Sequence, residues 1–321
     1  MGVVAELNPP RQLVGLHPLE YEHSLDSQAL EALKATPGLE MLGRQIVKHG
    51  IERMFSIQLE GSNIRISERN YPELHQLLIQ ACTALELPTL PRLYLEEGEH
   101  INGYTVGVER PIIVLSTGAV ERLSAMEMLG LLGHEAGHIK SAHGMYHLMA
   151  QVVSSSAQIL GDFTFGLGNL LSQPLQFALL RWSRCSEFSS DRAGLLACQD
   201  PTACVDLMLK LAGSPHSEHE PVHREEFIEQ AMEFESINMD SLSKVMKFFI
   251  GLGRTHPWTV LRCAELLRWV QSGEYDRVLN RQNSRKVFTR REAEIFFCRA
   301  CSYRLQGDEA FCPHCGGKLE S

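Results

Sequence analysis

Two histidines and a glutamate stand at spacings that suit metal-assisted hydrolysis, in the stretch His134-Glu135-Ala136-Gly137-His138. On a helix, both imidazoles would share one face and reach a single ion, and Glu135 would reach a water on that ion. Zn²⁺ with three protein ligands keeps one position for water and lowers its pKa to about 7. Glu135 would accept the proton of this water and pass it to a leaving amine. The alternative is a chance match of the pentapeptide.

A carboxylate pair later in the chain offers the third ligand. Glu187 and Asp191 are four residues apart, on a segment that residues 193–196 extend as a helix, so the two side chains would share a face. One carboxylate would bind the metal, and the other would accept the ring N–H of a ligand histidine. The other interpretation is a solvated pair of acids beside Arg184 and Arg192.

The helix that carries the two histidines has its own start signal. Ser124 and Glu127 fit a capping box, and an apolar stretch over residues 128–132 follows. His143 lies five residues after His138, and we expect it near the site without binding the metal.

The fold class predicted around this helix is α+β and predominantly helical. Residues 1 to about 50 form an amphipathic helical region with a break at Pro37-Gly38, and residues 72–87 form a further helix. From residue 118 the pattern is helical almost to residue 280. The strands, which would form a small mixed or antiparallel sheet, are predicted at residues 54–59, 63–66, 92–96 and 111–115.

With these residues in view, the chain resembles the zinc metallopeptidases typified by HtpX and the CAAX prenyl proteases, members of the gluzincin group. HEAGH followed by SRCSEFSSD carries the resemblance. Asn102 to Gly107 resembles the family's Asn-x4-Gly strand, and His256-Pro257 with Arg262 resembles its His-Pro-x4-Arg element. The resemblance spans about residues 70 to 270 and implies a zincin-like metallopeptidase domain.

The resemblance also implies roles for individual residues. Glu187 would be the third zinc ligand and Asp191 the partner of a ligand histidine. The strand from Asn102 to Gly107 would pair with substrate backbone, His256 would help stabilise the oxyanion, and Arg262 would support the site. A plain hairpin turn at Asn102 to Gly107, and a plain helix start at His256-Pro257, are the alternatives.

Two departures from the family pattern stand out. Many relatives have Ala after the strand Asn, where this chain has Gly103. Membrane relatives insert spans between the two ligand segments, whereas the uncharged run over residues 163–180 contains Gly166, Gly168 and Pro174. We therefore expect no integral membrane span, and peripheral membrane contact stays open.

The last part of the chain has the spacing of a zinc ribbon. Cys298-x-x-Cys301 is followed after ten residues by Cys312-x-x-Cys315, and each pair would present two thiolates to one structural Zn²⁺. Bound iron and a redox pair are the alternatives. The predicted organisation is a metallopeptidase domain over residues 1–280, a basic linker over 281–296 and the ribbon over 297–321.

Composition limits the partners and the compartment. The formal net charge is -9, so binding to nucleic acid is not expected. No signal peptide is visible, and the scattered cysteines are typical of a reducing compartment, which predicts the cytoplasm. The His-rich residues 215–226 suit a surface loop or an auxiliary metal patch.

Two functions from different classes remain at this stage. The first is a zinc endopeptidase acting on peptides or unfolded protein, with one catalytic and one structural zinc and with the ribbon as a structural, recruiting or regulatory module. The second is an inactive protease-like adaptor that presents the ribbon to a protein or nucleic-acid partner. Glu135 favours the enzyme, because an adaptor has no use for a general base beside a complete ligand set.

Overall fold

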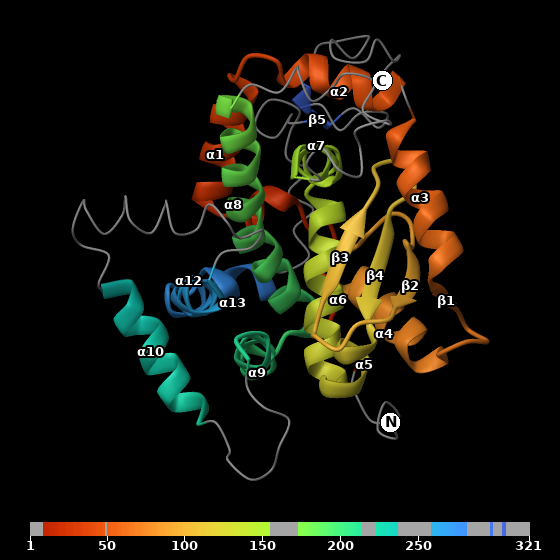
Figure 1. Ribbon diagram of the computed structural model, residues 1–321. Helices are drawn as coiled ribbons and strands as arrows, with labels where there is room; N and C mark the ends of the chain where they lie inside the picture. Colours follow the sequence, from red (N-terminus) through yellow and green to blue (C-terminus); the bar gives the residue numbers. More distant parts are fainter. Residues whose placement is uncertain are drawn as a thin grey trace.

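The computed structural model describes residues 9–48, 50–154, 173–213, 223–236 and 258–280, together with residues 296–297 and 304–305 (Figure 1). These residues form a predominantly helical α+β fold with one small sheet, as predicted. His256 and the four cysteines of the predicted ribbon lie outside the described residues.

Helices make up most of the described chain. A short 3-10 helix, η1 (Pro18–Glu20), precedes the α-helices. The α-helices are α1 (Ser24–Lys34), α2 (Leu39–Lys48), α3 (Ile51–Ser62), α4 (Pro72–Ala84), α5 (Thr117–Arg122), α6 (Ala125–Lys140), α7 (Gly144–Ser154), α8 (Gln173–Cys198), α9 (Pro201–Leu211), α10 (Arg224–Ser236), α12 (Thr259–Gln271) and α13 (Glu274–Leu279).

The sheet is mixed and has the strand order β1-β2-β4-β3. Its strands are β1 (Ile64–Ile66), β2 (Arg92–Glu96), β3 (Gly103–Val106) and β4 (Ile112–Ser116). The central pair β2 and β4 is parallel, and the two outer pairings are antiparallel. β3 is therefore an edge strand of this sheet, which favours the strand interpretation of Asn102 to Gly107 over a plain turn.

Helices cover both faces of the sheet. Side chains alternate along the strands, so each strand has apolar side chains that pack on either face. Leu93 and Ile113 pack into the main core with α4 and α6. Tyr94 and Val114 point to the opposite face, where Leu59 of α3 packs against them. Figure 1 shows α6 between the strands and α8.

The strand predicted at residues 54–59 is wrong, since these residues belong to α3. Phe55, Ile57 and Leu59 alternate with polar residues, which favours a strand by local pattern. In the fold, Ile51, Phe55 and Leu59 lie four residues apart and pack inward as one helical face, while Ile57 is 63% exposed. Packing against the sheet thus overrides the local alternation.

Three other local predictions, all on described residues, agree with the structure. Ser124 and Glu127 form the predicted capping box at the start of α6. The predicted helix at residues 72–87 corresponds to α4, and the break at Pro37-Gly38 separates α1 from α2. In the parts of the chain that can be described, no helix is both long enough and apolar enough to cross a bilayer.

The tightest helix packing joins α6 to α8 and depends on small residues. A Cβ placed on Gly133 would lie 2.3 Å from Ala197 Cβ, and one on Gly137 would lie 2.5 Å from Ala193 Cβ. Non-bonded carbon atoms do not approach so closely, so these two positions of α6 have room for glycine only while α8 stays in place. This contact brings the two histidines of α6 next to the carboxylates of α8.

Candidate active site

Three side chains from α6 and α8 converge on one point. His134 Nε2 and His138 Nε2 are 3.2 Å apart. His134 Nε2 lies 3.5 Å from Glu187 Oε2, and His138 Nε2 lies 3.4 Å from Glu187 Oε1. Donors bound tetrahedrally to zinc at about 2.0 Å are separated by about 3.3 Å. The three distances therefore fit a single zinc-sized ion with one open position.

The charge of the site also favours a cation. Glu135, Glu187 and Asp191 supply three buried carboxylates, and Arg262 supplies one guanidinium. The side chains of Glu187 and Asp191 are only 3% and 5% exposed, so water does little to stabilise the excess negative charge. A divalent ion would offset it.

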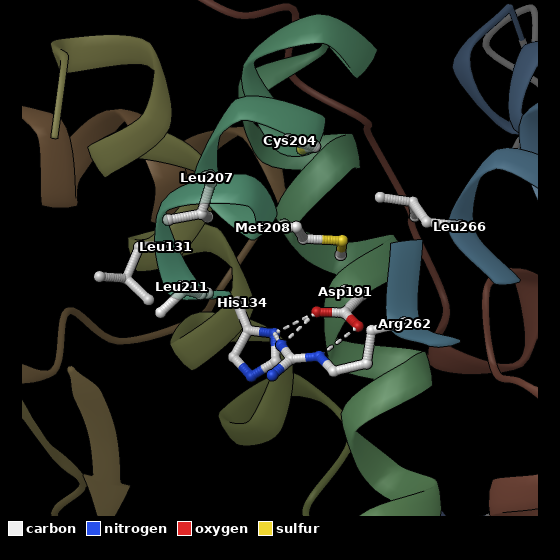
Figure 2. Close-up of a pocket in the computed structure, with 11 residues that line it drawn as sticks. Leu131, His134, Asp191, Cys204, Leu207, Met208, Leu211, Arg262 and Leu266 are labelled. Atoms are coloured by element: carbon white, nitrogen blue, oxygen red, sulfur yellow. Dashed lines mark hydrogen bonds and ion pairs between the residues drawn. The ribbon is translucent and has the colours of Figure 1, made fainter. Parts of the chain in front are cut away.

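Asp191 holds the first histidine in the orientation that metal binding needs (Figure 2). Its Oδ1 lies 3.0 Å from His134 Nδ1, and because a carboxylate only accepts, His134 donates from Nδ1 and keeps the lone pair of Nε2 for the ion. The same carboxylate receives two hydrogen bonds from Arg262, of 2.8 Å from Nε and 2.6 Å from Nη2. Asp191 therefore lies in contact with His134, where the predicted partner of a ligand histidine would lie.

These contacts shift the pKa values of the buried groups. Burial acts to raise the pKa of Asp191, but Arg262 and His134 overcome it and hold that pKa below its usual range. For His134, burial lowers the pKa, while Asp191 and Glu187 more than compensate and raise it to about 10. For His138, burial dominates and lowers the pKa. In the absence of metal, the two histidines therefore differ in pKa, and His134 binds a proton more strongly than His138.

Glu135 lies beside the ligand set and is oriented by the edge strand. Thr105 Oγ1 donates to Glu135 Oε2 across 2.8 Å. On the same strand, a Cβ placed on Gly103 would lie 3.3 Å from Leu131 and 3.4 Å from Glu135 Oε1. The chain therefore has its smallest residue where β3 passes the predicted general base.

The two predicted substrate-binding residues bracket β3. Asn102 is exposed, and its backbone is held by Ser116 through hydrogen bonds of 2.9 and 3.0 Å. Gly107 has φ 104°, which favours glycine, and a Cβ there would lie 3.1 Å from Glu52. Glu52 Oε1 accepts from the backbone N–H of Val108 at 2.8 Å, which fixes the chain as it leaves the strand.

A small cavity lies behind His134, on the side that faces Asp191 and Arg262 (Figure 2). Its volume of about 20 Å³ suffices for one water molecule. Cys204, Met208 and other apolar side chains complete the lining. The cavity is too small to take a substrate side chain.

The structure also brings in residues that the sequence did not single out. Thr105 and Asp26 have no sequence signal that marks them, because each acts through a contact between distant segments. His143, expected near the site, lies 3.1 Å from His138, and His147 follows one helical turn later. The spacing His138, His143, His147 is the signal that could have pointed to this cluster.

Comparison with known proteins gives a family match over the region that holds the site. The family model "Peptidase family M48" matches residues 68–270. "Plastoglobule-localized metallopeptidase 48, chloroplastic" from Arabidopsis thaliana is 30% identical over 281 residues, which cover 87% of this chain and 80% of that protein. "Protease HtpX homolog" proteins from Burkholderia thailandensis and Burkholderia mallei are 24% identical over 250 residues, or 70% of this chain and 81% of theirs. No solved structure matches the chain significantly.

Proposed function

Because the chain belongs to peptidase family M48, we propose that it is a zinc-dependent endopeptidase whose ligands are His134, His138 and Glu187. The observation that carries the proposal is the convergence of these three buried side chains: one ligand atom from each lies within 4.8 Å of the other two, and the two Nε2 atoms are 3.2 Å apart. Glu135, at the neighbouring position on α6, acts as the general base.

When bound, zinc supplies Lewis-acid chemistry, since it lowers the pKa of a coordinated water to about 7 and polarises a carbonyl oxygen. Glu135 accepts the proton of the attacking water and delivers it to the leaving amine. Thr105 keeps the Glu135 carboxylate aimed during this transfer, because its hydroxyl donates to Oε2. Asp191 and Arg262 keep His134 in the tautomer that leaves Nε2 free.

The substrate is a peptide or a segment of unfolded protein. β3 is at the edge of the sheet, and an extended segment would add to it by backbone hydrogen bonds. Asn102 and Gly107, at the two ends of β3, would bound this contact. His256 would stabilise the oxyanion, and this role comes from the family resemblance alone.

We further propose that residues 297–321 form a zinc ribbon with Cys298, Cys301, Cys312 and Cys315 as ligands of a structural zinc, after a basic linker over 281–296 and a peptidase domain over 1–280. Support comes from β5 (Phe296–Phe297) and β6 (Arg304–Leu305), which pair antiparallel. The first cysteine pair lies in the six residues between them, as in a zinc knuckle. The ribbon would recruit substrate or regulate the enzyme, and nucleic acid is not proposed as a partner because the chain is acidic.

For the compartment we propose the cytoplasm, with peripheral membrane contact as part of the proposal. The cysteines of the described chain are free thiols, and most are buried. Their burial suits small apolar core residues in a reducing environment. Cell fractionation that places the protein in an oxidising compartment would contradict this part of the proposal.

The decisive experiment compares cleavage of reduced casein by the wild-type protein and Glu135→Gln, with the zinc content of each. We expect activity in the wild type, a loss of about 10²-fold or more in Glu135→Gln, and equal zinc in both. Equal cleavage by both proteins would contradict the proposed role of Glu135 as the general base. If neither protein cleaves casein although zinc is bound, the next variant to test lacks residues 281–321. No cleavage by that variant either would favour the inactive adaptor.

Zinc content tests the two-site organisation. We expect two zinc ions per wild-type chain and one in His138→Ala. We expect Cys312→Ser to lose the other ion and keep the catalytic one. If Cys312→Ser lost both ions, the ribbon and the peptidase domain would not be separate metal sites.

A further inference from the structure

A second line of buried contacts runs outward from the other ligand histidine. His138 Nδ1 lies 3.1 Å from His143 Nδ1, and His143 Nε2 lies 3.3 Å from Asp26 Oδ2. Ser189 Oγ donates to the same oxygen of Asp26 across 2.6 Å. Asp26 is 0% exposed and His143 is 4% exposed, so water does not compete for these contacts.

The chemistry of the groups orders the protons along this line. The carboxylate of Asp26 only accepts, so His143 donates to it from Nε2. A neutral His143 then has a lone pair on Nδ1, which accepts the N–H of His138 Nδ1. His138 is left with a lone pair on Nε2, the atom that lies 3.4 Å from Glu187.

We propose that Asp26, acting through His143, fixes the metal-binding tautomer and the ring orientation of His138. Both are positioning residues, and the inference rests on the proposed function, in which His138 binds zinc. The arrangement parallels that of the first histidine: Asp191 holds His134 directly, whereas Asp26 holds His138 through one intervening imidazole.

The location of Asp26 gives the N-terminal region a part in the site. Asp26 lies in α1, which precedes the residues that the family model matches. The helix is fastened to α8 next to the ligand Glu187, since His23 donates its backbone N–H to Ser189 Oγ at 3.0 Å. Tyr21 adds a contact between its hydroxyl and Ser141 at the end of α6, at 3.0 Å. The predicted N-terminal helical region is thus part of the metal centre's support.

A purely structural reason for a buried Asp26 is weak. Its Oδ1 has no hydrogen-bond partner among the described residues, and an unpaired buried carboxylate oxygen costs stability. The other oxygen, Oδ2, carries the contacts to His143 and Ser189. The carboxylate is therefore held by the side that orients His143.

The same histidines could instead hold a second ion, since ring nitrogens of His138, His143 and His147 lie within 4.8 Å of one another. The contacts favour the relay. His143 already uses both nitrogens, and the ring nitrogens of His147 lie 3.1 Å from Ser186 Oγ and 3.4 Å from Ser183 Oγ. An ion would have to displace these partners and take His138 through both of its nitrogens.

The test measures zinc affinity in the full-length chain, by dialysis against graded chelator concentrations and elemental analysis. The catalytic zinc is the ion that His138→Ala lacks. Four variants are compared: Asp26→Asn, His143→Leu, His143→Gln and, as a matched control, Tyr21→Phe. Tyr21→Phe removes a buried hydrogen bond of the same N-terminal region without touching the relay.

We expect Asp26→Asn and His143→Leu to bind the catalytic zinc about 10- to 100-fold more weakly than the wild type. Tyr21→Phe should bind within about threefold of the wild type. His143→Gln should recover most of the affinity lost in His143→Leu, because its amide oxygen can accept the His138 N–H. If Asp26→Asn does not fold, the comparison of His143→Leu with His143→Gln decides alone.

Wild-type affinity in a folded His143→Leu protein would overturn the relay, as would equal losses in Asp26→Asn and Tyr21→Phe. A third zinc per chain that His143→Leu removes would overturn it in favour of a second ion. A wild-type protein whose zinc does not depend on His138 would refute the proposed function itself. The failure of the relay and the failure of the function therefore give different results.

Discussion

Thr105 Oγ1 donates a hydrogen bond to Glu135 Oε2 across 2.8 Å and lies 3.2 Å from the backbone oxygen of the same residue. The contact joins the edge strand β3 to the helix that carries the two proposed histidine ligands. Because substrate is proposed to pair with β3, the strand that would align the peptide also holds the proposed general base. Through the side chain of Thr105, the position of the scissile bond and the orientation of the Glu135 carboxylate would depend on the same strand.

Thr105→Val tests this coupling. Valine keeps the shape of threonine and removes the hydroxyl, so Glu135 loses its donor while the strand remains. We expect kcat to fall about tenfold, the effect of one misdirected hydrogen bond of about 1.4 kcal/mol. KM and zinc content should change by less than about twofold, as measured with a fluorogenic peptide and elemental analysis.

Thr105→Ser supplies the control, since it restores the hydroxyl without the methyl group. Its kcat should lie within about threefold of the wild type. A fall in kcat for Thr105→Ser as large as that for Thr105→Val would mean that packing, and not the hydrogen bond, is responsible.

Gly133→Ala addresses the contact between α6 and α8. The added Cβ would lie 2.3 Å from Ala197 Cβ and 3.1 Å from Gly194 Cα, so α8 must shift and carry Glu187 away from the histidines. We expect a loss of about 1–3 kcal/mol in the free energy of unfolding and weaker zinc binding. Urea unfolding and chelator competition measure the two effects.

The matched control for this variant is Gly61→Ala. Gly61 lies in α3, and a Cβ there meets nothing within 4 Å. Alanine should leave stability unchanged or raise it by up to about 1 kcal/mol. A Gly133→Ala protein as stable as Gly61→Ala would show that the helix contact tolerates a methyl group.

Local pattern predicted the parts of the fold that are set by local physics. The capping box at Ser124 and Glu127, and the pairing of residues four apart on α6 and α8, were recoverable because both depend on helical periodicity alone. Residues 54–59 were not recoverable, because their alternation of apolar and polar residues is compatible with a strand. The helix is favoured only when Leu59 and Phe55 can pack on the sheet and Ile51 can pack on neighbouring helices.

The residues of the candidate site also fall into a group that the sequence predicted and a group that it did not. His134, Glu135 and His138 form a contiguous motif, and Glu187 with Asp191 forms a periodic one. Thr105 and Asp26 act across gaps of 30 and more than 100 residues along the chain, where no spacing rule applies. Sequence therefore identifies the groups of the site that stand in a motif, whereas the contacts of Thr105 and Asp26 emerge only from the fold.

Arg262→Met probes the buried charge balance. Arg262 is 9% exposed and pairs with Asp191 through two hydrogen bonds, so its removal takes away a buried positive charge that offsets the carboxylates. We expect a loss of about 3–5 kcal/mol in the free energy of unfolding of the zinc-free protein. The loss should be smaller with zinc bound, because the ion supplies positive charge beside Glu187.

Arg224→Met is the comparison, since Arg224 pairs with Asp206 through hydrogen bonds of 2.6 and 2.7 Å. The geometry is also bidentate, but the Arg224 side chain is 40% exposed. We expect a loss below about 1 kcal/mol. Equal losses in the two variants would show that burial of the Arg262 pair has no energetic consequence.

The pH dependence of zinc binding follows from the unequal histidines. Asp191 and Glu187 raise the pKa of His134 to about 10, so the metal-free protein carries a proton on His134 at neutral pH. Burial lowers the pKa of His138, which therefore contributes no proton there. Zinc must displace one proton, and its affinity should rise about tenfold per pH unit between about pH 6.5 and 8. Asp191→Asn removes a negative charge beside His134 and so lowers the pKa of that histidine, and the rise of affinity with pH should be less steep in that variant. Chelator competition at a series of pH values gives both slopes, and a wild-type affinity that stays constant between about pH 7 and 8 would contradict the assignment of the proton to His134.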